Sequence, residues 1–285
     1  MAIAPQTTEK LERLTAALES KGRVLVALSG GVDSTLCMKI AHDTLGYERA
    51  FAVTAKSETL TPDEFEGICE LARQQGWNHH SIEYSELAIP HYAENPVNRC
   101  FFCKHELYTR LAELAQEWGC SCVIEGTNAD DRGDYRPGMK AAAQIGTFAP
   151  LLECDVTKAE IREMAKHFGL PNWSKPSGAC LSSRFPYGKT ITREGLDRVA
   201  AAEDYLHELG FTQVRVRYHD NLARIEVVPE ELPRFFEDSL NVKVASRLRE
   251  IGFLYISVDL VGYRTGSMNE VMTAPMVAEY STQRR

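Results

Sequence analysis

The chain has 285 residues, of which 44% are hydrophobic and 25% charged; this is ordinary for a globular protein and allows two domains. The formal net charge of −8 argues against broad nucleic-acid binding, which draws most of its free energy from phosphate neutralisation. No apolar run approaches the roughly 18 residues of a membrane span, and the N-terminus lacks the basic and apolar regions of a signal peptide. We therefore expect a cytoplasmic protein.

Strands and helices alternate through the first half of the chain. An amphipathic helix over 7–20 comes first, because Leu11, Leu14 and Leu18 recur at helical spacing. Short apolar runs then predict strands near 23–28, 50–54, 79–83 and 121–125, with helices near 34–46, 62–75 and 103–118 between them. This alternation predicts an α/β fold with a doubly wound parallel sheet, whose ligands bind beyond the carboxyl ends of the strands.

The pattern changes after a helix over 157–168. Prolines and glycines interrupt residues 170–192, and a loop of this length is usually functional or disordered. A further helix, two alternating strands over 214–218 and 223–227, two helices and a last strand over 254–258 make a small α+β domain. We expect one domain over 1–188, a second over 189–275 and a tail over 276–285.

The segment S-G-G-V-D-S, from Ser29 to Ser34, lies where the first strand turns into a helix. Gly30 and Gly31 let the backbone approach a ligand, and the helix directs its free N–H groups at the same point. Such a turn favours an anion, above all a phosphate. The two serine hydroxyls add donors, and Asp33 is placed to hold either Mg²⁺ or the loop itself.

The same segment lacks the lysine of the common mononucleotide-binding loop. It resembles the SGGxDS loop of the PP-loop ATP pyrophosphatases, and the resemblance covers about residues 20–185. It implies the fold of that superfamily, and a loop that holds the pyrophosphate of ATP while a substrate oxygen is adenylated.

A second polar segment, E-G-T-N-A-D-D at 125–131, follows the last strand of the predicted sheet. A parallel sheet places Gly126 and Thr127 beside the phosphate loop, where small residues admit a ribose or an adenine. Asp130 and Asp131 either hold a metal or cap a helix, and capping is the commoner role.

This second segment resembles the G-T-N-x-D-D sequence of several PP-loop enzymes. The resemblance implies a nucleotide-binding role for Gly126 and Thr127. It also implies that the end of the second strand, Ala55 to Ser57, contacts the adenine.

Three of the eight cysteines stand apart. Cys100 and Cys103 form a C-x-x-C pair just before a predicted helix, whose N-terminus stabilises thiolates. The pair alone is consistent with a redox dithiol, half of a zinc site or part of an iron–sulfur site. Cys180 lies in a basic, glycine-rich loop that favours a reactive thiolate. The other five are expected to be small buried side chains: Cys37, Cys69, Cys120, Cys122 and Cys154.

Arginines favour an anionic ligand in the second domain. Arg215 and Arg217 share one face of a strand, Arg224 lies across the hairpin, and Arg184 follows Cys180 in the loop. A solvated strand face also explains such arginines, but three of them on one hairpin indicate phosphate binding.

Four motifs occur in an order that resembles the LarE family: S-G-G-V-D-S, N-R-C-F-F-C-K, G-T-N-A-D-D and S-G-A-C-L-S-S-R-F. LarE proteins are ATP-dependent sulfur transferases of nickel-pincer nucleotide biosynthesis, which serves lactate racemase. The resemblance implies ATP, Mg²⁺ and an anionic substrate, pyridinium-3,5-biscarboxylic acid mononucleotide. Its carboxylates are adenylated and then converted to thiocarboxylates.

Two sulfur sources are known in that family. In one type, a single cysteine at the position of Cys180 gives up its sulfur and ends as dehydroalanine. In the other, two added cysteines, matched here by Cys100 and Cys103, complete a three-cysteine 4Fe–4S cluster whose free iron carries sulfide. This sequence resembles the cluster-bearing type, with the sacrificial route as the alternative.

Three other functions are compatible with parts of the pattern. A PP-loop tRNA thiolase shares the loop and often the cluster cysteines, but the acidic charge argues against nucleic acid as a partner. An amide-forming ATP-dependent synthetase would need no cysteine cluster, and a nucleotide sensor would release no pyrophosphate. Members of the LarE family are often homo-oligomers, which the resemblance extends to this chain.

Overall fold

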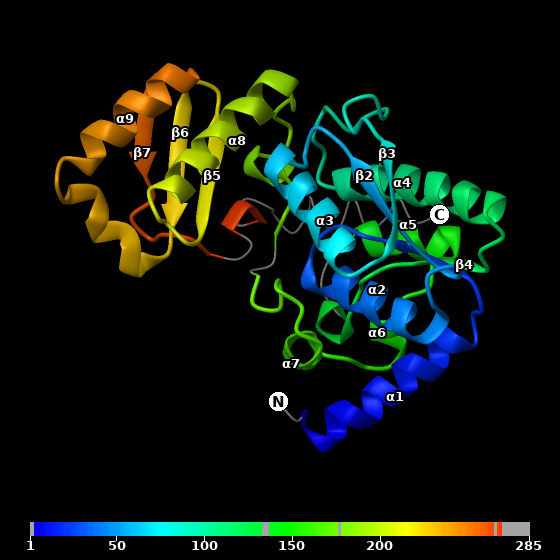
Figure 1. Cartoon of the computed structure of the whole chain (residues 1–285). Coiled ribbons are helices and arrows are strands. Elements are labelled where there is room, and N and C mark those ends of the chain that lie inside the picture. Colours follow the sequence, from blue (N-terminus) through cyan, green and yellow to red (C-terminus); the bar gives the residue numbers. More distant parts are fainter. Residues whose placement is uncertain (1–2, 133–136, 176–177, 265–266, 270–285) are drawn as a thin grey trace. The chain divides into compact units, whose positions relative to one another are not determined.

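Figure 1 shows a computed structural model of the chain, which describes residues 3–132, 137–175, 178–264 and 267–269. The contacts divide the chain into two compact units, Met1–Ser85 with Cys100–Gly178, and Glu86–Arg99 with Ala179–Arg285. The expected assignment of a nucleotide domain and a substrate domain stays a prediction, and the expected tail lies outside the described residues.

The first unit is built on a four-stranded parallel sheet in the order β3–β2–β1–β4. Its strands are β1 (Val24–Ala27), β2 (Ala50–Lys56), β3 (Asn78–Glu83) and β4 (Cys122–Ile124). The chain adds β2 and β3 on one side of β1 and then returns to add β4 on the other. The strand order therefore reverses between β1 and β4, which is where ligands bind in such sheets.

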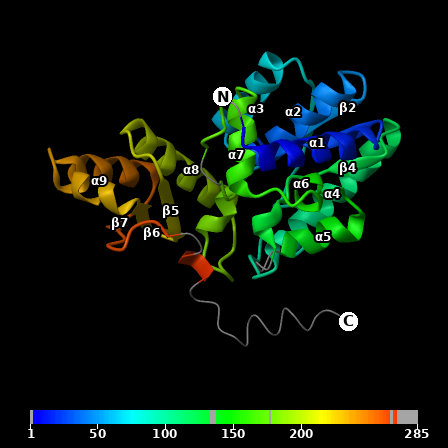
Figure 2. The ribbon, with the colours of Figure 1, turned by 90° about the horizontal axis from the view of Figure 1, so that it is seen from below.

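Helices cover both faces of this sheet, as the predicted doubly wound fold requires (Figure 2). Side chains of β1 alternate, with Val24 and Val26 in one core and Leu25 in the other. The first core is covered by α1 (Pro5–Glu19), α2 (Val32–Leu45), α3 (Pro62–Gln74), α6 (Pro150–Glu153) and α7 (Lys158–His167), and the second by α4 (Arg99–Glu117) and α5 (Pro137–Ile145).

Local signals set several of these boundaries. Thr61 begins α3 with a capping box completed by Glu64, and Thr157 begins α7 in the same way with Glu160. The prediction for the start of α4 was wrong, because the helix begins at Arg99. Cys100 and Cys103 therefore lie within its first turns and not before it.

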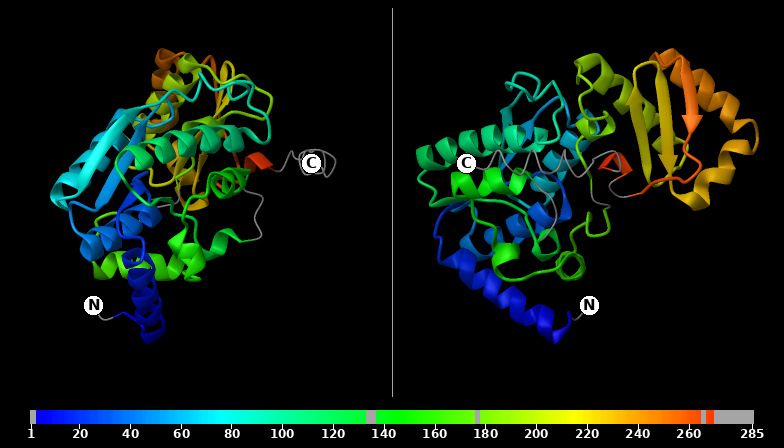
Figure 3. Two further views of the ribbon diagram at one scale, coloured as in Figure 1. Left: turned by 90° about the vertical axis from the view of Figure 1, so that its right-hand side faces the viewer. Right: turned by 180° about the vertical axis from the view of Figure 1, so that it is seen from behind.

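The second unit contains a three-stranded sheet in the order β5–β6–β7, visible in the right-hand view of Figure 3. β5 (Val214–His219) and β6 (Leu222–Val227) form the predicted antiparallel hairpin, and β7 (Tyr255–Val258) pairs with β6 in parallel. The apolar side chains of the sheet form one core with α8 (Arg193–Glu208) and α9 (Leu240–Ile251). Short 3₁₀ helices complete the described chain: η1 (Ala129–Asp131), η2 (Leu181–Arg184), η3 (Pro229–Phe236) and η4 (Ser267–Asn269).

Residues 86–99 are held within the second unit by buried hydrogen bonds to η2. The Tyr92 hydroxyl lies 2.7 Å from the Ser182 hydroxyl, and Arg99 donates to the Ser182 carbonyl at 3.0 Å. Across the part of the chain that the structure describes, no helix is long and apolar enough to cross a membrane.

Candidate active site

The segment from Ser29 to Ser34 connects β1 to α2 and forms an open turn. Gly31 is the N-cap of α2 and supplies no side-chain cap, so the first N–H groups of the helix remain available to a ligand. The Ser29 and Ser34 hydroxyls lie 3.1 Å apart, which ties the two ends of the turn together. Gly30 has φ +74°, and a Cβ there would lie 2.6 Å from Ile68 Cγ1, so only glycine fits.

Gly126 brings the end of β4 against this turn. A Cβ at Gly126 would lie 3.0 Å from the backbone nitrogen of Ser34 and 3.1 Å from Cβ of Asp33. The structure therefore brings the two motifs together at the switch point between β1 and β4, as predicted. Ala55 and Ser57, at the carboxyl end of β2, lie on the same edge of the parallel sheet. Their contact with an adenine stays a prediction.

Lys158 is a site residue that sequence reasoning missed. It is the first residue of α7, and its ammonium group forms an ion pair with Oδ2 of Asp33. Oδ1 of Asp33 is buried without a hydrogen-bond partner in the described part of the chain. A lysine at a helix N-terminus opposes the helix dipole, and this unfavourable position was the available sequence signal. The pair places one cation and one carboxylate beside the helix N-terminus.

The two aspartates of the second motif have capping roles. Asp131 accepts from the backbone nitrogen of Asn128 at 3.0 Å, which completes a capping box, and Asp130 accepts from the backbone nitrogen of Lys158 at 2.8 Å. Of the two roles predicted for these residues, capping is the one that the geometry supports. Asp130 thereby fixes the start of α7 and, with it, the position of Lys158.

Thr127 is held by the carboxylate that precedes it. Its backbone nitrogen and hydroxyl donate to Oε2 of Glu125 at 3.1 and 2.6 Å. Burial raises the pKa of Glu125, and the donors of Thr127 and the charge of Lys104 oppose that shift. The predicted nucleotide contact of Thr127 stays a prediction.

Cys100 and Cys103 lie on one face of α4, because residues three apart on a helix are neighbours. Cys100 is exposed, and the carbonyl of Cys103 accepts from the Tyr84 hydroxyl at 2.8 Å. The pKa of Lys104 is raised, chiefly by Tyr108 and further by both thiols and Glu125. A lysine therefore stands beside the thiol pair.

Cys180 belongs to the second unit, where its thiol is exposed on an anchored turn. It is the N-cap of η2, and its carbonyl accepts from Nη1 of Arg184 at 3.0 Å. Ser182 is fully buried. The described residues include no group of three or more His, Cys, Asp or Glu side chains that is arranged to hold a metal. The predicted three-cysteine set is thus divided between the units and stays a prediction.

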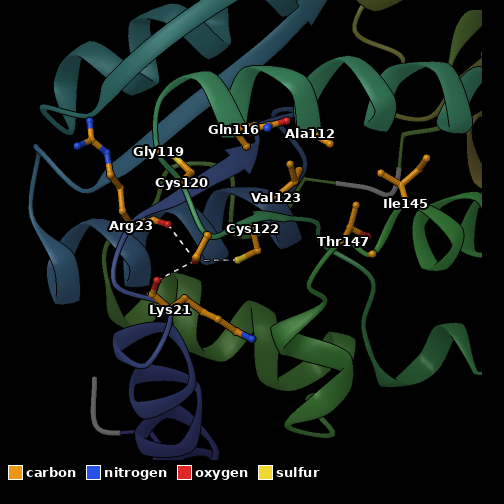
Figure 4. Close-up of a pocket in the computed structure, with 13 residues that line it drawn as sticks. Lys21, Arg23, Ala112, Gln116, Gly119, Cys120, Cys122, Val123, Ile145 and Thr147 are labelled. Atoms are coloured by element: carbon orange, nitrogen blue, oxygen red, sulfur yellow. Dashed lines mark hydrogen bonds between the residues drawn. The ribbon is translucent and has the colours of Figure 1, made fainter.

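The prediction that the other five cysteines are buried holds for only two of them. Cys37 and Cys154 are buried, whereas Cys69, Cys120 and Cys122 are partly exposed. Cys120 and Cys122 line an open cavity of about 460 Å³ before β1 and β4, with Lys21 and Arg23 on its rim (Figure 4). Burial raises the pKa of both thiols, so they remain protonated near neutral pH. This cavity lies at the opposite end of the strands from the phosphate loop.

The predicted substrate arginines are largely occupied by carboxylates of the second unit. Arg184 is buried and pairs with both oxygens of Glu203 at 2.9 and 2.8 Å. Arg217 pairs at 2.6 Å with Glu226, which is fully buried. The hairpin therefore has more compensating acids than the sequence suggested, and the face that carries the arginines is buried rather than solvated.

Arg224 joins the same network through Glu226 at 3.2 Å and through Asp259. Arg215 donates to the carbonyl of Val214 at 2.6 Å, and burial, with Arg184 nearby, lowers its pKa. The ion pairs that join the described residues of this network are Arg184 with Glu203, Arg217 and Arg224 with Glu226, and Arg224 and Arg264 with Asp259. Substrate binding by Arg184, Arg215, Arg217 and Arg224 stays a prediction.

Comparisons with known proteins extend over nearly the whole chain. The asparagine synthase family matches residues 7–130. The uncharacterized protein slr1717 of Synechocystis sp. is 47% identical over 93% of this chain and 98% of its own length. The pyridinium-3,5-bisthiocarboxylic acid mononucleotide synthase of Lactiplantibacillus plantarum is 39% identical over 95% of this chain and 98% of its own length. The uncharacterized protein MJ0830 of Methanocaldococcus jannaschii is 24% identical over 85% of this chain and 91% of its own length.

Replacing Gly126 by alanine should weaken ATP binding about tenfold, because the added methyl group pushes β4 away from the first turn of α2. Isothermal titration with ATP measures the loss. Gly67→Ala is the matched control, since a Cβ at Gly67 meets nothing within 4 Å. Equal ATP affinity in the Gly126 variant and the wild type would contradict the close packing.

Replacing Glu226 by glutamine should lower the free energy of unfolding by about 3 kcal/mol, because buried Arg217 loses its charged partner. Glu250→Gln removes an exposed partner of Arg247 and should change stability by less than about 1 kcal/mol. All three tryptophans lie in the first unit, whereas Glu226 lies in the second. Urea unfolding is therefore followed by tryptophan fluorescence, which reports on the first unit, and by circular dichroism, which reports on both. A Glu226 variant with wild-type transitions in both signals would show that this pair does not stabilise the fold.

Proposed function

Because the chain belongs to the LarE family of PP-loop ATP-dependent sulfur transferases, we propose that it makes thiocarboxylates from pyridinium-3,5-biscarboxylic acid mononucleotide. The product is named in its relative from Lactiplantibacillus plantarum. The observation that carries the proposal is the open turn at Ser29–Ser34, packed against Gly126. A helix N-terminus without a side-chain cap suits the pyrophosphate part of ATP.

The first step is adenylation of a substrate carboxylate. The N–H groups at the start of α2 hold the β- and γ-phosphates, and Lys158 supplies a positive charge beside them. The carboxylate oxygen attacks the α-phosphorus, and the bond to the bridging oxygen breaks, so pyrophosphate leaves. The acyl adenylate now carries AMP, a far better leaving group than oxide.

Mg²⁺ fits this arrangement. Oδ1 of Asp33 is buried and lacks a partner among the residues described, and carboxylate oxygens are ligands that Mg²⁺ prefers. When bound, the ion would neutralise phosphate charge. Lys158 holds the other oxygen of the same carboxylate, so the carboxylate keeps one orientation.

The second step transfers sulfur to the activated carbonyl. An exposed thiol at Cys180, on a turn anchored by Ser182 and Arg184, suits attack on a bound acyl adenylate. Cys100 and Cys103 fit as two further thiolate ligands of a 4Fe–4S cluster, which supplies sulfide when bound. In the sacrificial route the sulfur of Cys180 displaces AMP, and loss of the Cα proton then breaks the Cβ–Sγ bond, which leaves dehydroalanine in the chain and the thiocarboxylate as product. Sulfide carried by a cluster would displace AMP in the same way.

The substrate carries one phosphate and two carboxylates. The three arginines of one hairpin, Arg215, Arg217 and Arg224, support its binding to the second unit, since guanidinium groups recognise phosphates and carboxylates. Arg184 already donates to Glu203 and to the backbone around Cys180, so its role is to position the thiol segment.

The reaction is tested directly with anaerobically purified protein, ATP, Mg²⁺, sulfide and the pyridinium biscarboxylic acid mononucleotide. We expect pyrophosphate release and, by mass spectrometry, a product in which sulfur replaces a carboxyl oxygen. Cys180→Ala should retain pyrophosphate release and lose the sulfur-containing product, because only the second step needs the thiol. No pyrophosphate release with this substrate would overturn the proposed function.

The sulfur source is decided by iron and acid-labile sulfide in the anaerobic protein. We expect both in the wild type, together with visible absorption, and their loss in Cys100→Ala. Cys69→Ala is the control, since Cys69 is a partly exposed helical thiol outside the trio. An iron-free wild type whose mass falls by H₂S during turnover would instead establish the sacrificial route.

A further inference from the structure

Asn172 contacts the nucleotide loop from a segment far away in the sequence. Its Nδ2 donates to the carbonyl of Gly30 at 3.2 Å and to Oγ1 of Thr35 at 2.9 Å. The carbonyl can only accept, so the donor NH₂ group has to face it, and the orientation of the amide is fixed. Asn172 thus joins Gly30, whose backbone is in the left-handed region, to the first turn of α2.

The segment that carries Asn172 is itself well anchored. Gly169 ends α7 with φ +69°, and Leu170 is fully buried in the first core. The ammonium of Lys166 lies 4.6 Å from the ring centroid of Trp173. Leu170 thus anchors the chain two residues before Asn172, and Lys166 holds the exposed ring of Trp173 against the end of α7.

The geometry of one peptide bond gives this contact a functional meaning. In a trans peptide, the carbonyl of one residue and the N–H of the next point in opposite directions. A hydrogen bond that fixes the carbonyl of Gly30 therefore also fixes the N–H of Gly31. That N–H precedes the free N–H groups of α2 and adds a donor for the phosphates.

The oxygen of the same amide group shows that this position is unusual. Oδ1 of Asn172 is buried and has no hydrogen-bond partner in the described portion of the chain. A buried acceptor without a partner is unfavourable for folding. The amide nitrogen contacts the nucleotide loop at Gly30 and the first turn of α2 at Thr35, while the oxygen has no partner among the described residues, which points to a role at the loop rather than in general stability.

We propose that Asn172 is a positioning residue that orients the Gly30–Gly31 peptide for the pyrophosphate part of ATP. The inference rests on the proposed function for the identity of the nucleotide. Asn172 acts through the backbone and needs no contact with the ligand. Its loss weakens recognition of the β- and γ-phosphates and leaves recognition of the adenosine part unchanged.

Binding of ATP, AMP and inorganic pyrophosphate to Asn172→Ala tests this role. We expect the Kd for ATP and for pyrophosphate to rise about tenfold, as loss of one oriented donor predicts, and the Kd for AMP to change by less than about twofold. The matched control is Asn78→Ala, in which an amide nitrogen also donates to a carbonyl, that of Tyr47, at the amino end of β3.

Two results would overturn the role of Asn172. One is wild-type ATP affinity in Asn172→Ala. The other is an equal loss of affinity for ATP and AMP, which indicates general loosening of the first unit. Asn172→Leu has a similar shape, removes both donors and adds no charge, so a rise in the Kd for ATP equal to that of Asn172→Ala separates the donors from the cavity left by alanine. Product formation by the wild type is a separate readout, so failure of the proposed reaction is recognised independently.

Discussion

The close approach of β4 to the first turn of α2 is the constraint on which the first unit depends. A side chain at Gly126 would press against the first turn of α2, and a side chain at Gly30 would press against Ile68. The backbone at the switch point is therefore packed from two sides, while the N–H groups at the start of α2 stay open. An anion is the group that such a turn stabilises best, so the same packing that holds the sheet together also makes the binding site.

Charge is arranged differently in the two units. In the first, Lys158 and Asp33 form a partly exposed pair, and the other carboxylate oxygen of Asp33 has no hydrogen-bond partner among the residues that the structure describes. In the second, Glu226 is fully buried between Arg217 and Arg224. A buried network of this kind requires every partner, since removing one carboxylate leaves a desolvated cation. The second unit thus holds the guanidinium groups of Arg217 and Arg224 in fixed positions.

Local sequence signals predicted the sheet, the phosphate turn and the starts of α3 and α7. Each depends on residues close together in the chain, such as Thr61 with Glu64 at a capping box. The start of α4 was missed although Asn98, a residue type favoured at an N-cap, immediately precedes Arg99, and α5 was not predicted at all.

Long-range partners could not be predicted in the same way. The pairing of Arg184 with Glu203 depends on how α8 packs beside η2, and the contact of Asn172 with Gly30 joins residues 142 positions apart. Lys158 gave a weak signal, because a cation at a helix N-terminus is unfavourable unless a specific anion lies nearby. The candidate site was therefore predicted from its backbone motifs, whereas the side chains packed around it required the fold.

The turn at Cys180 separates the chemistry of the thiol from the stability of the fold. Its carbonyl and the residues that follow are fixed by Arg184 and buried Ser182, while the sulfur itself is exposed. A sulfur atom that leaves the protein has to be accessible, and its loss must not disturb the backbone around it. The same two properties suit a thiolate that binds a cluster iron. The turn is therefore equally compatible with both sulfur sources, and the distinguishing feature is the pair of thiols on α4, Cys100 and Cys103, which a single sacrificial cysteine would not need.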